Sequence, residues 1–312
     1  MAQPVPGPSA SNLPQVKRQP RRLGDGLRAV AFLIPAVVFL AVFVYIPAGM
    51  SLVLGFYHYH LLGVNTTLAG LENFRSALSY PVFWIAFRNT MYFALLMIPS
   101  TVVGSVFIAL LLRRNSRIFS VVRTAVLLPY ITPVIATSIG WLWMFDPQYG
   151  IFNAVLSFLH LPTSQWMLSP SAAMPAVALY TLWHGIGFDV VIVLSALAGI
   201  PSTVLEAASI DGATEWQKFW KVTLPLLSPV IFFLVMVTTL ASLQAFSQVY
   251  ALSSGQGGPE YATTTLMLLI YQTGFQYFHI SYAAAMAIIL VLMILLVSLV
   301  QMGFAKRWVF YQ

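Results

Sequence analysis

Asp189 is the only carboxylate in the long apolar stretch of residues 172–199. A charge at the centre of a membrane helix costs about 2.5–3.5 kcal/mol on insertion scales, so this side chain is expected to face the inside of a helix bundle or a wet cavity. There the carboxylate could accept hydrogen bonds from substrate hydroxyl groups, alone or together with Gln244 and Gln248. The alternative is a structural pair with a polar group on a neighbouring helix, or with Arg88.

Other side chains of the apolar stretches are candidates for the same polar path. Trp183 precedes Asp189 by six residues, and Ser242 and Phe246 belong to a later segment that is unusually rich in hydroxyl and amide groups. The ring of Phe246 could stack on a substrate ring, although aromatic side chains in membrane helices more often serve packing alone. His184, beside Trp183, is expected to be a neutral packing histidine, because no chain of ionisable groups continues from it.

The commonest enzymatic signatures are missing from the chain. None of its four lysines follows a glycine, so there is no Walker A loop, and ATP that drives this protein would be hydrolysed by another chain. Neither H-E-x-x-H nor G-x-S-x-G occurs. The run 185–189, G-I-G-F-D, is close to the G-x-G-D of intramembrane aspartyl proteases, but its aspartate is one residue late and lacks a second carboxylate. We expect no catalytic residue, metal site or cofactor on this chain.

The composition is that of a membrane protein. Of the 312 residues, 59% are hydrophobic and 7% are charged, whereas an average soluble domain has about 25% charged residues. Cysteine is absent, which excludes disulfides, iron–sulfur clusters and cysteine-based zinc sites. The net charge is +7, but the basic residues flank apolar spans and form no patch with interleaved aromatic residues, so no nucleic-acid partner is expected.

Six membrane-spanning segments are predicted from the apolar runs: residues 27–54, 83–112, 118–145, 172–199, 230–250 and 280–302. Pro129 and Pro133 predict that the third helix is kinked or interrupted, with freed carbonyl groups that need partners inside the bundle. Residues 262–276 are apolar but too short to span, which indicates an interfacial or re-entrant segment. Residues 1–26, rich in Pro, Ser, Gln and Arg, are expected to form a disordered tail.

The distribution of lysine and arginine predicts the orientation. Thirteen of the fifteen lie in the tail, in residues 113–123, in the loop after the fourth span, or at the C-terminus. Only Arg75 and Arg88 fall on the opposite side. Positive residues accumulate on the cytoplasmic side of membrane proteins, so both termini and the loop after the fourth span are expected to be cytoplasmic.

That loop, residues 200–229, is here called the hook. Two pairs in it fit the S/T-x-x-E/Q capping box that begins a helix: Thr203 with Glu206, and Thr214 with Gln217. Gly212 lies between them, where a left-handed residue would end the first helix without a steric penalty. We therefore expect a short helix, a sharp turn, and a second helix that is broken near Pro225 and Pro229.

The hook also carries a sequence match at several points, which is far more specific than a single triplet. The matching residues are Glu206-Ala207-Ala208, Asp211-Gly212-Ala213, Leu224-Pro225 and Pro229. They resemble the EAA loop of the permease subunits of binding-protein-dependent ABC importers, most closely the maltose-type sugar permeases. The alternative is that these residues only cap and favour a helix. That explains each residue singly, but not why such a hook stands in a cytoplasmic loop.

The resemblance implies an all-α integral membrane protein of six transmembrane helices with the type I ABC importer permease (MetI-like) fold over residues 27–312. It implies a second, related permease subunit, two cytoplasmic ATPase subunits that hold ATP and Mg, and an external substrate-binding protein. The setting would be the lipid of the plasma (inner) membrane of a bacterium or archaeon.

In that family this chain would form half of the translocation path for a carbohydrate, a di- or oligosaccharide. The residues that would couple it to an ATPase subunit are Glu206, Ala207, Ala208, Asp211, Gly212, Ala213, Leu224 and Pro225. Relatives that carry glycerol phosphate or polyols leave these substrates as alternatives. A self-contained secondary transporter is less favoured, because only Asp189 sits deep in a span and no clear repeat is found.

Overall fold

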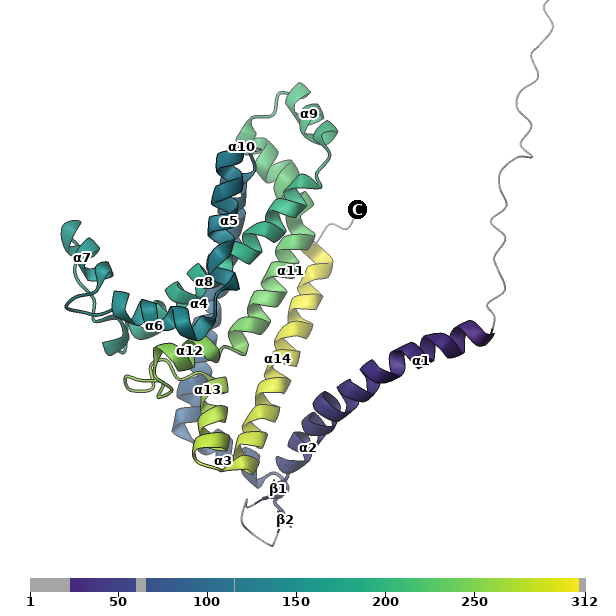
Figure 1. The fold of residues 1–312 in the computed structure, drawn as a ribbon, viewed down its shortest axis with the longest axis vertical. Helices are drawn as coiled ribbons and strands as arrows, with labels where there is room; N and C mark the ends of the chain where they lie inside the picture. The colour runs from purple at the N-terminus through teal and green to yellow at the C-terminus, as the bar shows by residue number, and fades with distance from the viewer. Residues whose placement is uncertain (1–22, 60–65, 115, 309–312) are drawn as a thin grey trace, which may run out of the picture. The chain divides into compact units, whose positions relative to one another are not determined.

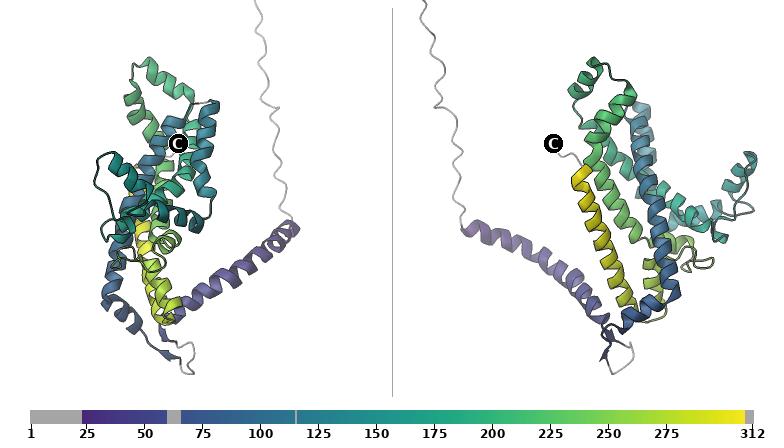
Figure 2. Two further views of the ribbon diagram at one scale, coloured as in Figure 1. Left: turned by 60° about the vertical axis from the view of Figure 1, so that its left-hand side comes forward. Right: turned by 180° about the vertical axis from the view of Figure 1, so that it is seen from behind.

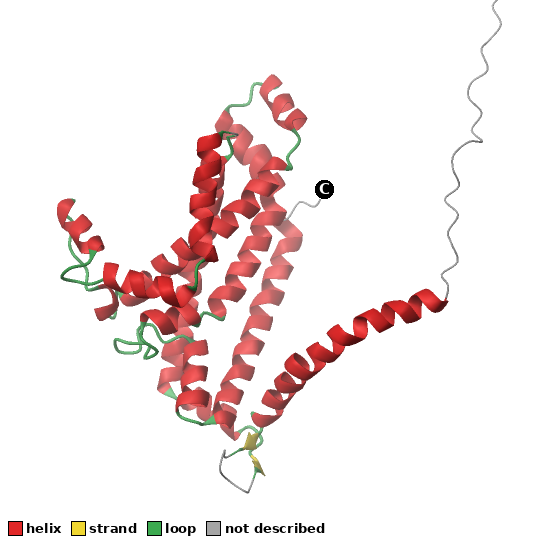
Figure 3. Cartoon of the chain, in the orientation of Figure 1, coloured by secondary structure: helices red, strands yellow, loops and turns green. Residues whose placement is uncertain are grey.

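The computed structural model describes residues 23–59, 66–114 and 116–308, and most of the tail expected at residues 1–26 lies outside them. The described chain is largely helical (Figure 3). Two short strands, β1 (Tyr57–His58) and β2 (Thr67–Leu68), pair in antiparallel fashion. The described structure thus agrees with the expected all-α class.

The described residues up to Met50 belong to a unit of their own. Helix α1 (Leu23–Leu40) continues through a π-helical turn, η1 (Ala41–Tyr45), into α2 (Ile46–Leu54). From Val30 to Leu54 this helix is long and apolar enough to cross a membrane. The first predicted span is therefore confirmed as a helix, and Pro35 and Pro47 inside it do not interrupt it, as membrane helices allow.

The remaining residues form a helix bundle (Figure 1). Its central helix, α4 (Pro81–Leu112), packs against α8 (Ala173–Ala198) and α11 (Leu224–Leu243). Helix α14 (Ile280–Trp308) lies beside α11, and the right-hand view of Figure 2 shows the two running together. Large apolar side chains such as Phe107 and Leu299 remain exposed on the outside of these helices, as expected for surfaces that face lipid.

The third predicted span is bent more sharply than the sequence indicates. Helix α5 (Arg117–Ile131) and helix α6 (Val134–Met144) meet at 102° across Thr132 and Pro133. Thr132 has the extended backbone that a residue before proline favours, with φ −81° and ψ 149°. The interruption is thus confirmed. The described chain has five helices able to span a membrane, or six if this pair counts as one.

The fifth predicted span, residues 230–250, had the wrong boundaries. The helix begins as α10 (Glu215–Lys218), passes through the π-helical turn η3 (Phe219–Thr223), and continues as α11 to Leu243. The break expected near Pro225 and Pro229 is absent from this helix. In the widened turn the Leu224 amide donates to the carbonyl five residues earlier, which gives the Pro225 ring the space that an α-turn would deny it.

Short helices connect the long ones and complete the bundle. They are α3 (Glu72–Ser79), α7 (Ile151–Phe158), the 3₁₀ turn η2 (Trp166–Leu168), α9 (Ser202–Ile210), α12 (Ser247–Leu252), α13 (Leu266–Tyr271) and the π turn η4 (Gln272–Gln276). Helix α13 with η4 is too short to cross a membrane, as the sequence predicts for residues 262–276.

Candidate functional site

The first helix of the hook, α9, stands at one end of the bundle (Figure 1). Its N-cap is Pro201, which offers no side-chain hydrogen bond, and Thr203 already lies inside the helix. The capping box predicted from Thr203 and Glu206 is therefore wrong. The pattern of residue types is present, but a threonine can cap only from the N-cap position, and the helix starts too early for that.

The end of α9 is built as the sequence predicts. Gly212 has a left-handed backbone with φ +77°. The Gly212 amide donates to the Ser209 carbonyl at 3.1 Å, and the Ala213 amide donates to the Ala208 carbonyl at 3.0 Å. This pair of bonds is a Schellman motif, which satisfies carbonyl groups that the helix end would leave free. No atom lies within 4 Å of a Cβ placed at Gly212, so backbone conformation alone requires glycine.

The second helix of the hook starts with the predicted capping box. The Thr214 amide donates to Gln217 Oε1 at 2.9 Å, and the Gln217 amide donates to Thr214 Oγ1 at 3.3 Å. Both halves of the reciprocal cap are therefore formed. Together the turn at Gly212 and this cap fix the path of the chain between α9 and α10 with bonds local to the hook.

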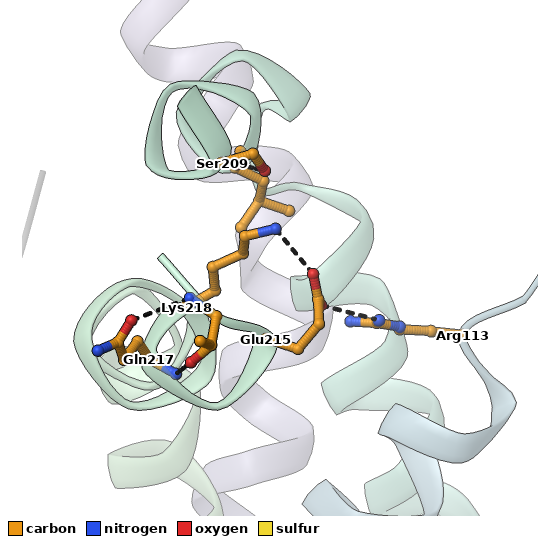
Figure 4. Close-up of polar contacts among 7 residues, drawn as sticks. Arg113, Ser209, Glu215, Gln217 and Lys218 are labelled. Atoms are coloured by element: carbon orange, nitrogen blue, oxygen red, sulfur yellow. Dashed lines mark hydrogen bonds and ion pairs between the residues drawn. The ribbon is translucent and has the colours of Figure 1, made fainter. Parts of the chain in front are cut away.

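A set of charges joins the base of the hook to the end of α4. Glu215 accepts a hydrogen bond from Lys218 Nζ at 2.7 Å, and its other oxygen lies 3.9 Å from Arg113 Nη2 (Figure 4). Arg123 donates to the Leu112 carbonyl at 3.0 and 2.6 Å, and so caps the last turn of α4. Sequence analysis did not predict these contacts. The Glu215–Lys218 spacing is a recognisable helix pair, whereas the contact with Arg113 has no local signal.

The hook buries little of its own surface. Helix α9 has no buried residue, Glu206 and Ala207 are exposed, and 87% of the Ile210 surface is accessible. Trp216, on α10, is 69% exposed. An apolar helix surface that no other described part of the chain covers is typical of a docking site for another protein.

The predicted coupling residues divide between two places in the hook. Those from Glu206 to Ala213 lie on α9 and in the turn that follows it. Leu224 and Pro225 lie beyond η3, in the first turn of α11, where Leu224 packs against the buried cluster between α4, α8 and α11. In the first group Ala208 and Ala213 are half-buried and the other four residues are exposed, whereas the second group anchors the hook to the bundle.

Asp189 is half-buried on α8. The ion pair with Arg88 that was one alternative is not formed, since neither residue takes part in an ion pair within the described ranges. Gly185 lies one turn before Asp189 on the same face, and a Cβ placed there has no atom within 4 Å. Asp189 therefore shares its helix face with open space.

The opposite face of α8 is closely packed. A Cβ at Gly187 would collide with the Val126 carbonyl oxygen and lie 2.8 Å from the Cα atom of Leu127. Only glycine permits this approach between the backbones of α5 and α8, as small residues do in membrane bundles. In residues 185–189, the run that resembled a protease motif, Gly187 therefore serves the packing of α8 against α5.

Two side chains of α8 bind the corner between α5 and α6. His184 Nε2 lies 3.1 Å from the Thr132 carbonyl oxygen, and the Tyr180 hydroxyl donates to the Val134 carbonyl at 2.8 Å. The Thr137 hydroxyl lies 2.7 Å from that of Tyr180. With the Thr132 amide and hydroxyl, which both donate to the Pro129 carbonyl, they give the carbonyl groups at the proline break the partners that they were expected to need. His184 packs as expected, whereas Tyr180 was not singled out from sequence.

The other predicted path residues lie in aromatic packing or at the break after α11. The Trp183 ring is 5.1 Å from that of Trp141, and the Phe246 ring is 4.9 Å from that of Tyr271. Phe246 packs against the buried cluster that contains Trp141. Ser242 is buried, Gln244 is exposed and Gln248 is half-buried. No hydrogen bond links any of them to Asp189 within the described ranges.

Comparison with known proteins places this geometry in a family. Residues 100–309 match the family described as the binding-protein-dependent transport system inner membrane component. The probable ABC transporter permease protein YesP of Bacillus subtilis is 33% identical, over 92% of this chain and 93% of that protein. The lactose transport system permease protein LacF of Rhizobium radiobacter is 32% identical, over 88% and 93%.

Two further similarities complete the comparison. The sn-glycerol-3-phosphate transport system permease protein UgpA of Pectobacterium atrosepticum is 31% identical, over 89% of this chain and 94% of that protein. The crystal structure of a bacterial alginate ABC transporter superposes with a TM-score of 0.80, at 23% identity, over 91% of this chain and 96% of that chain, and shows the fold. The chain therefore belongs to the inner membrane components of binding-protein-dependent transport systems, the permease subunits of ABC importers.

Proposed function

We propose that this permease forms half of the translocation path of an ATP-driven importer of a di- or oligosaccharide, and that its hook docks on an ATPase subunit. The observation that carries the docking proposal is the uncovered surface of α9, with Ile210 and Glu206 exposed on a helix that buries no residue. The Schellman turn and the capping box give this surface a fixed shape. Closure of the ATPase subunits would then move α9 and the adjoining span together.

The assembly that this function needs has three other kinds of component. A second, related permease subunit would complete the path, two ATPase subunits would hold ATP and Mg, and an external binding protein would deliver the substrate. In this proposal residues 1–26 are a cytoplasmic tail, residues 27–312 are the membrane domain, and both termini and the hook face the cytoplasm of a bacterium or archaeon. The positive-inside distribution of charge supports that orientation.

We favour a carbohydrate as the substrate on two grounds, the side chain of Asp189 and the substrates for which several relatives are named. Asp189 offers an acceptor for hydroxyl groups on the open face of α8, and a carboxylate there would repel a phosphate. Relatives named for the transport of lactose and of sulfoquinovosyl glycerol support a sugar. The relatives named for sn-glycerol-3-phosphate keep that substrate as the second candidate.

The docking proposal is tested by a matched pair of substitutions in the assembled transporter. Ile210→Ser places a polar group on the exposed face of α9, and Leu71→Ser does the same to an exposed apolar residue of another loop. We expect Ile210→Ser to weaken retention of the ATPase subunits during purification and Leu71→Ser to leave it unchanged. Equal retention in both variants would contradict docking through α9.

A substitution in the assembled transporter also tests the role of Asp189. Asp189→Asn keeps the size of the side chain but removes its charge and one acceptor oxygen. Uptake of radiolabelled sugar should fall while the ATPase subunits remain bound. Loss of the ATPase subunits, or undiminished uptake, would show that Asp189 serves structure and not the path.

A further inference from the structure

A cavity of about 470 Å³ lies between α4, the start of α8 and the loop after α12. Two side chains of opposite charge line it, Arg88 from α4 and Glu260 from the loop. Neither forms an ion pair within the described ranges. The Tyr92 and Ser171 side chains add hydroxyl groups, and Met174 adds apolar surface. The cavity thus presents a donor, an acceptor and apolar surface to the same space.

The position of Arg88 indicates that this space is wet. Arg88 lies seven residues inside α4, or about 10 Å along a helix whose length and composition suit a membrane span. Its side chain is exposed in the chain as described. At 1.5 Å per residue this 32-residue helix is about 48 Å long, so Arg88 lies near the boundary of a hydrocarbon core of about 30 Å, where a guanidinium group extends into water. The exposed face of α4 at Arg88 and Tyr92 is therefore better suited to water and polar ligands than to lipid.

The loop holds Glu260 at the cavity by an unfavourable backbone conformation. Glu260 and the following Tyr261 both have positive φ angles, +49° and +60°. Residues other than glycine adopt this region at a cost and keep it only where their surroundings hold them. The buried Asn89 does so, because its Nδ2 donates to the Tyr261 carbonyl at 2.7 Å and to the Thr264 carbonyl at 3.1 Å. Arg88 of α4 thus supplies the positive charge of the cavity, and the adjacent Asn89 holds the loop that carries the negative charge of Glu260.

We propose that this cavity is a binding site for an uncharged sugar. Neighbouring hydroxyl groups of a sugar ring can accept hydrogen bonds from the Arg88 guanidinium and donate to the Glu260 carboxylate. The Tyr92 ring and Met174 offer apolar surface to the face of the ring. A phosphorylated or acidic sugar would gain from Arg88 but would be repelled by Glu260 across the same cavity. This inference rests on the proposed function, and it narrows the substrate to the uncharged members of the carbohydrate class.

The native chain contains no cysteine, which permits a direct test in the assembled transporter. Ser171→Cys places a single thiol at the cavity, and Ser157→Cys places one on an exposed position of α7 that does not line it. Both variants are treated with a membrane-impermeant thiol reagent. Labelling is measured with lactose, maltose or raffinose, with glycerol 3-phosphate or galacturonate, or with no addition. Co-purification of the ATPase subunits is recorded in parallel, so that a failed transporter assembly is recognised separately.

The expected result is that at least one uncharged sugar slows labelling of Ser171→Cys several-fold and leaves Ser157→Cys unchanged, while the anionic compounds do not protect. In Ser171→Cys combined with Glu260→Gln, the uncharged sugar should lose protection and glycerol 3-phosphate should gain it. Combination with Glu72→Gln, at an exposed glutamate elsewhere, should alter neither.

Three outcomes would overturn the proposal. The first is the absence of protection by every uncharged sugar while the ATPase subunits remain bound. The second is stronger protection by the anionic compounds in the chain that retains Glu260. The third is protection by the external binding protein alone, without sugar, which would make the cavity a protein contact.

Discussion

The turn at Gly212 and the corner at Pro133 are both interruptions between helices, and they satisfy freed polar groups in different ways. At Gly212 the hook uses its own backbone and the Thr214–Gln217 cap. At Pro133 the Thr132 amide and hydroxyl serve the Pro129 carbonyl locally, and further partners come from α8, through Tyr180 and His184, across 46 and 52 residues of sequence. The first interruption is complete within the hook, whereas the second ties two helices of the bundle together.

This difference follows from the surroundings. The hook is exposed, so water can serve whatever its backbone leaves free, and local bonds suffice. Inside a membrane bundle an unsatisfied carbonyl costs several kcal/mol on the scale of apolar transfer, so neighbouring side chains must reach it. Changes at the corner should therefore destabilise the bundle, and changes at the hook should affect coupling while the bundle stays folded.

The largest effect is expected from Gly187→Ala, beside the corner. Its Cβ would meet backbone atoms of Val126 and Leu127, which cannot move aside as a side chain can. Overpacking of this kind costs about 1–3 kcal/mol or more. The melting temperature and the fraction of monodisperse protein in detergent should both fall. Gly185→Ala, on the same helix with open space around its Cβ, should leave both unchanged or slightly improved; parity of the two variants would refute the close-approach account.

The next effect is expected from Gly212→Ala in the hook. An L-residue in the left-handed region costs roughly 1–2 kcal/mol, and the strain is confined to the turn because no other atom lies within 4 Å. Binding-protein-stimulated ATPase activity should fall while the melting temperature of the bundle stays constant. Gly70→Ala is the control, since Gly70 also has a positive φ and open space but lies in another loop. A similar loss of ATPase activity in both would remove the special role of the hook.

A smaller effect is expected when the corner loses a single hydroxyl group. Tyr180→Phe removes only the hydroxyl group that contacts Val134 and Thr137, and a bond of this kind contributes about 1 kcal/mol. The melting temperature should drop modestly, with uptake reduced in proportion to the amount of folded protein. Tyr130→Phe is matched to it, because the Tyr130 hydroxyl makes no hydrogen bond within the described ranges. A larger loss in Tyr130→Phe would contradict the assignment.

The smallest effect is expected from alanine substitutions at the two threonines, Thr214 and Thr203, for which the sequence predicted capping boxes. Thr214→Ala removes a formed cap, which is worth about 1 kcal/mol of local helix stability, whereas Thr203→Ala removes no cap. Hydrogen exchange of the α10 amides should speed up in Thr214→Ala, and exchange of the α9 amides should hardly change in Thr203→Ala. Faster exchange of α9 in Thr203→Ala would restore the capping box predicted from the sequence.

Sequence was sufficient where the signal is local. Gly212 and the Thr214–Gln217 cap were predicted because turn and cap residues stand within a few positions of the bonds they make. The same reasoning failed at Thr203, because Pro201 is the N-cap of α9 and the T-x-x-E pattern begins two residues too late to cap it. The family match in the hook added the fold and the transporter class.

Sequence was insufficient where distant residues decide. A break was expected at Pro133, but not its angle, which depends on how Tyr180 and His184 hold the corner. The end of α11 was placed too late, although the polar residues Gln244, Ser247 and Gln248 already lower the hydropathy past Leu243. The chain breaks there where the Thr265 hydroxyl, twenty residues on, donates to the Ala245 carbonyl.

The π turn at Phe219–Thr223 also sets the rotation of the hook about the long axis of α11. One extra residue in a single turn rotates everything beyond it by about 100° relative to an uninterrupted α-helix. If the backbone hydrogen bonds of this turn changed from the i→i−5 to the i→i−4 pattern, α10 would rotate about the helix axis while α11 kept its packing in the bundle. Spin labels at Trp216 and Leu111, compared with and without ATP, would register such a twist as a change in distance. The junction between hook and span can thus transmit torque as well as tilt.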